Sequence, residues 1–104
     1  MALMPAAVRS RLTAEMADME RERQQAAKKS VEAAARTLAK AGWRVDTSVR
    51  NGVPVDELLK AADEANADLI ALGARGTTGL NRLLLGSVAE GALKRASLPV
   101  LLVR

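Results

Sequence analysis

The sequence predicts a three-layer α/β domain built on a parallel sheet. Residues 12–41 contain no Gly or Pro and place small or apolar side chains at steps of three, four and seven, the spacing of an amphipathic helix. Residues 69–72 and 100–103 are apolar at every position and too short for helices, which indicates strands covered on both faces. Together with a further strand at residues 43–50 and the helices between the strands, they are expected to form two consecutive right-handed βαβ units.

The long helix is expected to end at a left-handed cap. Gly42 follows Lys40 and Ala41, and glycine after a basic last turn is typical of helix C-termini. A coiled coil is the alternative for this helix. The stripe is mostly Ala, however, and has no sustained Leu or Ile seam.

Residues 43–50 change to a period of two, which predicts a half-buried strand at a sheet edge. Asn51 and Gly52 then form a turn, and Pro54 suits the first position of a helix that ends near Asn66. The acidic residues of this helix are expected to be solvated surface groups. A last helix is expected over residues 87–96, and Pro99 is tolerated at the start of the final strand.

Composition excludes several functions. The chain of 104 residues has no Cys, His or Tyr, which rules out triad hydrolysis, Cys/His zinc sites and disulfide scaffolds. Trp43 is the only aromatic residue, and its side chain is expected to pack in the core rather than to stack on a ligand. The net charge of +4 comes from interspersed charges, so neither nucleic acid nor membrane is an expected partner. With no signal peptide or membrane span apparent, a cytoplasmic protein is expected.

The informative segment is the glycine-punctuated loop between the two apolar strands. It leaves the carboxyl end of a parallel strand and enters a helix, where open α/β sheets bind ligands. Gly73, Gly76 and Gly86 would present bare amides to an anion, and the helix start at Ser87 adds unpaired donors and a partial positive charge. A phosphate fits such a place, with Arg75 as a further contact unless it is simply solvated.

A structural alternative exists for the end of this loop. Ser87 and Glu90 have the spacing of a capping box, in which the serine accepts a hydrogen bond from a helix amide and the glutamate reaches back.

The spacing Gly73-x2-Gly76-x9-Gly86-Ser87 resembles the signature G-x2-G-x9-G-(S/T) of the ATP-binding branch of the universal stress protein family. The flanking segments 67–70, 84–90 and 98–104 resemble that family too, and the likeness extends from about residue 12 to the C-terminus. It implies a Rossmann-like fold of the adenine-nucleotide alpha hydrolase type. It also implies a cytoplasmic stress regulator without dedicated catalytic activity, which binds ATP, with Mg²⁺ as the accompanying metal ion, and forms homodimers through the last strand.

By this resemblance Gly73, Gly76, Gly86 and Ser87 would contact phosphates and ribose, with Val88 beside them. The family's first strand, first helix and second strand have no counterpart here, so residues 1–11 are an N-terminal segment and 12–104 a truncated domain. Of the family sheet order 3-2-1-4-5, only strand 3 and the pair 4-5 would remain. Either the strand at 43–50 pairs directly with the strand at 69–72, or a second copy completes the sheet. The alternative function is a dimerisation or interaction module that binds no nucleotide.

Overall fold

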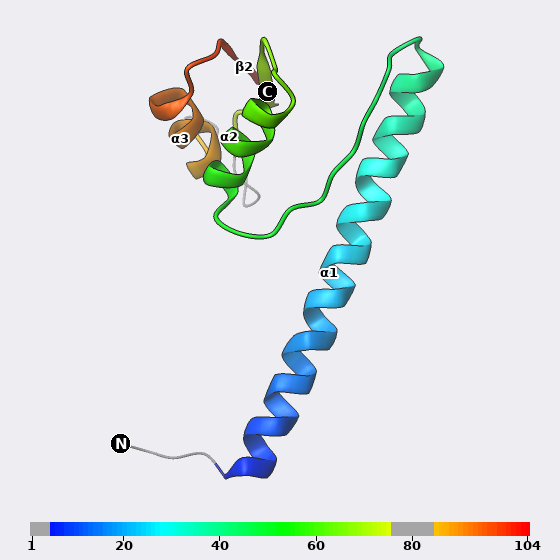
Figure 1. Ribbon diagram of the computed structural model, residues 1–104, viewed down its shortest axis with the longest axis vertical. Coiled ribbons are helices and arrows are strands. Elements are labelled where there is room, and N and C mark those ends of the chain that lie inside the picture. Colours follow the sequence, from blue (N-terminus) through cyan, green and yellow to red (C-terminus); the bar gives the residue numbers. More distant parts are fainter. Residues whose placement is uncertain (1–4, 76–84) are drawn as a thin grey trace. The chain divides into compact units, whose positions relative to one another are not determined.

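The computed structural model describes residues 5–75 and 85–104 (Figure 1). The chain divides into two compact units, Met1–Val49 and Arg50–Arg104. In chain order the elements are α1 (Ala6–Lys40), α2 (Pro54–Glu64), β1 (Ile70–Gly73), α3 (Ser87–Arg95) and β2 (Val100–Val103). The helices predicted at 54–66 and 87–96 and the two apolar strands are therefore confirmed, with ends shifted by no more than two residues.

The first unit is dominated by α1, a helix of 35 residues. It begins six residues earlier than the sequence predicts, directly after Pro5, because residues 6–11 also lack helix breakers. None of its residues is buried, and Met16 and Met19 are 67% and 60% exposed. The apolar stripe of this helix therefore stays open within the described part of the chain.

The predicted glycine cap of α1 is confirmed. Gly42 has a φ of +96°, its N–H donates to the Ala39 carbonyl at 3.0 Å, and the Trp43 N–H donates to the Leu38 carbonyl at 3.1 Å. These two bonds are the Schellman pattern, which satisfies carbonyls that the helix end leaves unpaired. The same pattern ends α2, where Asn66 has a φ of +51°.

The strand predicted at 43–50 is wrong. These residues form no strand, and after Trp43 none of their backbone groups is bonded to another backbone group within residues 5–75 and 85–104. A strand is stabilised by the ladder it shares with a neighbour, and here β1 and β2 pair with each other instead. The three-stranded arrangement in which 43–50 joins 69–72 is therefore not formed in the described residues.

In the second unit, β1 and β2 form a two-stranded parallel sheet in which Ile70 pairs with Val100 and Gly73 with Val103. The parallel sheet and its crossover through α3 confirm the α/β class. Burial alternates along both strands: Ile70 is 5% exposed, whereas Leu101 and Val103 are each 52% exposed. Only one face of this sheet is covered among the described residues, so the expected cover on both faces is not seen there.

In the second unit, helices α2 and α3 pack closely against each other. Ala89 and Ala92 of α3 are 1% and 0% exposed, and α3 contacts both α2 and β2. A Cβ added at Gly91 would lie 3.0 Å from Cγ2 of Val55, so the absence of a side chain there lets the helices approach. Across the same contact Nη1 of Arg95 lies 2.6 Å from Oδ1 of Asp56.

Candidate phosphate-binding site

The glycine-punctuated loop begins where β1 ends. The Ala74 N–H donates to the Val103 carbonyl at 2.8 Å, which extends the sheet by one bond, and the Gly86 N–H donates to the Ala74 carbonyl at 2.8 Å. The second bond brings the end of the loop back to its beginning. Of the predicted site residues, Gly73, Arg75, Gly86, Ser87 and Val88 thus lie at the carboxyl edge of the sheet. Gly76 is outside the described residues.

The N–H groups of Ala74 and Gly86 both donate to carbonyls within the protein. The expectation that Gly86 offers a bare N–H to a ligand is therefore wrong, because that N–H holds the loop closed. The first-turn amides of α3 have no acceptor within the helix. Ala89 is only 1% exposed, which leaves, among the described amides of this helix start, the N–H groups of Ser87 and Val88 for a ligand.

The capping box predicted as the structural alternative is not formed. Gly86 occupies the N-cap position with extended backbone angles, Ser87 is the first helical residue, and no side chain caps the helix. Glu90 does not reach back, and its Oε1 lies 3.1 Å from Nζ of Lys94. The exposed Ser87 hydroxyl is thus not engaged as a cap.

Gly73 leaves space at the end of β1. Its φ is not positive, and a Cβ built on it would meet nothing within 4 Å. Among the described residues, neither the backbone conformation nor the packing requires a glycine there. The residue instead keeps the approach to the strand end free of a side chain.

The electrostatics of this edge favour an anion. The start of α3 carries the positive end of the helix dipole. The charge of Glu90 in the first turn is balanced by Lys94, and Arg75 is exposed at the start of the loop. The described residues hold no group of three or more acidic, His or Cys side chains that would bind a metal ion.

Glu57 and Glu64 of α2 belong to a separate charged cluster that sequence reasoning missed. Nη1 and Nη2 of Arg50 donate to the two carboxylate oxygens of Glu64 at 2.8 and 3.1 Å, and Nε lies 3.6 Å from Oε2 of Glu57. The hydrogen bonds from Arg50 lower the pKa of Glu64. A possible signal was the seven-residue spacing of Glu57 and Glu64, which places both on one helix face. We call this cluster the Arg50 clamp.

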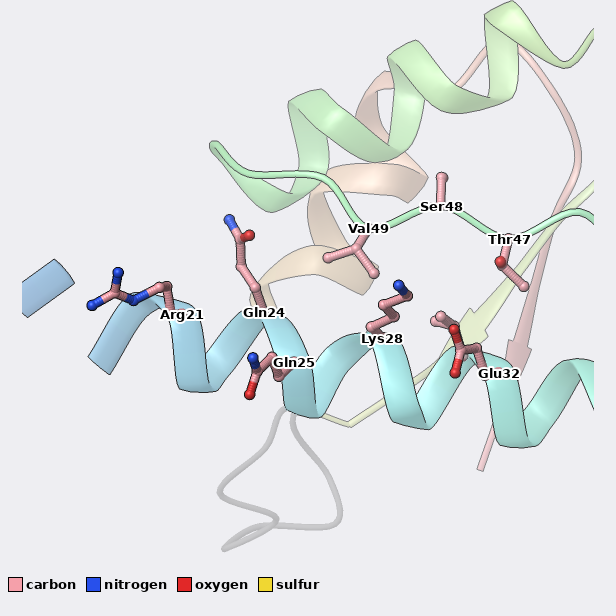
Figure 2. Close-up of a pocket in the computed structure, with 9 residues that line it drawn as sticks. Arg21, Gln24, Gln25, Lys28, Glu32, Thr47, Ser48 and Val49 are labelled. Carbon is pink, nitrogen blue, oxygen red and sulfur yellow. The ribbon is translucent and has the colours of Figure 1, made fainter. Parts of the chain in front are cut away.

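Each unit also contains a hollow lined by its own residues. In the first unit a groove of about 410 Å³ separates α1 from residues 47–49 (Figure 2). In the second unit a cavity of about 330 Å³ lies at the amino end of β1, opposite the edge where parallel sheets bind ligands. Among the described helices none is long and apolar enough to cross a membrane.

Comparison with known proteins identifies relatives of this chain. The model of the universal stress protein family matches residues 2–104. The universal stress protein MJ0531 of Methanocaldococcus jannaschii is 48% identical over 63 residues, 61% of this chain and 37% of that protein. The universal stress protein YxiE of Bacillus subtilis is 38% identical over 76 residues, 73% of this chain and 51% of that protein.

A solved structure agrees with these matches. The structure of MJ0577, a universal stress protein of Methanocaldococcus jannaschii, superimposes with a TM-score of 0.83 at 30% identity, over 89% of this chain and 65% of that one. This likeness confirms the α/β fold. The chain aligns with between 37% and 51% of the length of the curated relatives MJ0531, MJ0577 and YxiE. Because the family model matches nearly every residue, the chain belongs to the universal stress protein family.

Proposed function

We propose that this chain binds the phosphate groups of ATP, or of another phosphate ligand, at the start of α3, and acts as a regulator in the stress response of its family without a catalytic role of its own. The observation that carries the proposal is the uncapped helix start, where Ser87 stands as the first helical residue with its side chain outside any cap. Helix starts of this kind bind anions through their free N–H groups and the helix dipole.

Each described residue of the motif has a distinct part in this proposal. The amides of Ser87 and Val88 and the Ser87 hydroxyl donate to phosphate oxygens, and Arg75 adds a charge. Gly86 closes the loop, and Gly73 leaves room for the ligand. Any Mg²⁺ would be held chiefly by the phosphate oxygens, since no metal-binding cluster occurs in the described residues.

Calorimetric titration with ATP tests the site. Ser87→Ala removes one donor to a charged oxygen and should weaken binding by about tenfold or more. Ser97→Ala makes the same change at an exposed serine beyond the other end of α3 and should leave the affinity unchanged. Equal affinities for ATP in wild type and in both variants would show that the ligand does not bind at this helix start.

A second titration series separates the phosphates from the base. If the helix start holds phosphate, tripolyphosphate should compete with ATP whereas adenosine should not. Competition by adenosine alone would place the binding energy in the nucleoside and contradict the proposal.

The alternative function, a dimerisation or interaction module, is favoured by one observation. The outer face of the sheet exposes about half of Leu101 and Val103, and β2 has a free edge among the described residues. We propose that homo-oligomers form through this last strand. Sedimentation analysis of Val103→Lys should show weakened association, with Leu93→Lys on α3 as the matched exposed control. Association that is the same in both variants would exclude β2 as the contact.

A further inference from the structure

The segment that follows α1 has the properties of a strand without a partner. Residues 43–50 alternate apolar or β-branched residues with polar ones, yet their backbone forms no ladder within the described chain. In Figure 2 the side chains of Thr47 and Val49 point toward α1 and that of Ser48 points away, as in an extended chain. Unpaired extended backbone of this kind is a template for another strand.

The charges of this segment restrict how a second copy would pair with it. Arg50 is held by Glu64 and Glu57. Arg44 and Asp46 have no ion-pair partner in the described residues and are exposed. A pairing that uses them must place Arg44 opposite Asp46, because like charges directly opposite each other destabilise a sheet.

One symmetric antiparallel register meets this condition. With Val45 opposite Val45 of the second copy, Arg44 faces Asp46 twice, on the same face of the ladder. On the other face Trp43 faces Thr47 twice, which is an aromatic residue against a β-branched one. Trp43, now 67% exposed, would be partly covered.

Neighbouring registers are less favourable. A symmetry axis at Asp46 places that carboxylate against itself, an axis at Arg44 does the same for the guanidinium, and an axis at Thr47 sets Arg44 against Arg50. Parallel pairing in register also matches every charge with its own kind. An axis at Ser48 pairs Asp46 with Arg50, which the Arg50 clamp already engages.

We propose that residues 43–47 pair antiparallel with the same residues of a second copy of this chain, with Val45 on the twofold axis. This contact is separate from the proposed contact through β2 and lies in the first unit. It comprises five residue pairs, so association is weak and is best detected by a covalent trap.

The chain has no cysteine, which makes the trap specific. Val45→Cys brings two thiols opposite each other, where Cα atoms of paired strands lie about 4.5–5.5 Å apart, within the range of a disulfide. Val49→Cys is the matched control, because in this register the two copies of residue 49 lie about 26 Å apart. Under mild oxidation Val45→Cys should form the disulfide dimer at least about tenfold faster. Equal rates, or no dimer of Val45→Cys, would overturn the proposal and leave a different chain as the occupant.

Charge reversal tests the register in the Val45→Cys background. Adding Arg44→Asp sets carboxylates opposite each other and should slow cross-linking severalfold, and adding Asp46→Arg as well should restore the rate. Failure of the double reversal to restore it would overturn the register. The emission of Trp43 gives a readout on the unmodified protein: it should shift to shorter wavelength as concentration rises, and an unchanged spectrum up to millimolar protein would contradict the pairing.

Discussion

Replacing Ile70 by alanine removes the largest of the three buried side chains in the described residues, the other two being Ala89 and Ala92. Ile70 is 5% exposed, so the change loses nearly the whole transfer free energy of the side chain and leaves a cavity in the core. Such substitutions cost about 2–5 kcal/mol. At roughly 0.05–0.15 kcal/mol per residue, the second unit has a total stability on the order of 3–8 kcal/mol, so this change removes much of it.

The neighbouring Leu69 provides the comparison, because it is of similar size and 51% exposed. Leu69→Ala loses about half of the transfer free energy and creates no closed cavity, which amounts to about 1 kcal/mol. Hydrogen exchange of the β2 amides, followed by mass spectrometry, measures the opening of the sheet. Ile70→Ala should speed this exchange by about 30-fold or more, and Leu69→Ala by about fivefold. Equal acceleration by the two changes would refute the assignment of Ile70 as the centre of the core.

Three further predictions concern the caps, the charges and the helix contact. Gly42→Ala forces a side chain into a φ of +96° and should cost about 1 kcal/mol, seen as faster amide exchange in the last turn of α1. Glu64→Gln should lower stability near neutral pH. Because Arg50 lowers the pKa of Glu64, the contribution is present above the carboxyl's unfolded pKa of about 4.3 and is lost as the pH falls through the lower folded pKa. Urea unfolding at several pH values should therefore show wild type and variant converging in acid. Gly91→Ala should destabilise the unit through the 3.0 Å approach to Cγ2 of Val55, and should cost less in the Val55→Ala background, where only the Cβ of residue 55, 3.3 Å away, remains in contact.

Each of these three has its own control. Gly73→Ala, at a glycine with open space and no positive φ, should leave the stability of the unliganded protein nearly unchanged, and a loss equal to that of Gly42→Ala would contradict the strain argument. Glu22→Gln on α1 should not reproduce the convergence of Glu64→Gln in acid. If Gly91→Ala changes the free energy of unfolding equally in the wild-type and Val55→Ala backgrounds, the contact with Val55 does not restrict the side chain at position 91.

Local chemistry explains which predictions were confirmed. Gly42 ends α1 and Pro54 begins α2 because left-handed φ values and a missing N–H are properties of single residues. The capping box was wrong because Gly86 takes the N-cap position, one residue before Ser87. Ser-x-x-Glu spacing alone does not distinguish a cap from the first turn of a helix. The described residues of the predicted site lie at the carboxyl edge of the sheet, as expected, but the Gly86 N–H is bonded to the Ala74 carbonyl and is not open.

The amino-acid sequence by itself determined which stretches form helices, which segments are apolar strands, and the glycine and serine spacing on which the proposed phosphate site rests. These features depend on residue propensity and on spacing along the chain. Only the tertiary structure decided that β1 pairs with β2 while residues 43–50 stay unpaired, that the Gly86 N–H closes the loop, and that Leu101 and Val103 remain exposed. Pairing and burial depend on which distant backbone groups become neighbours, and hydrogen bonds to those neighbours compete with any bond to a ligand.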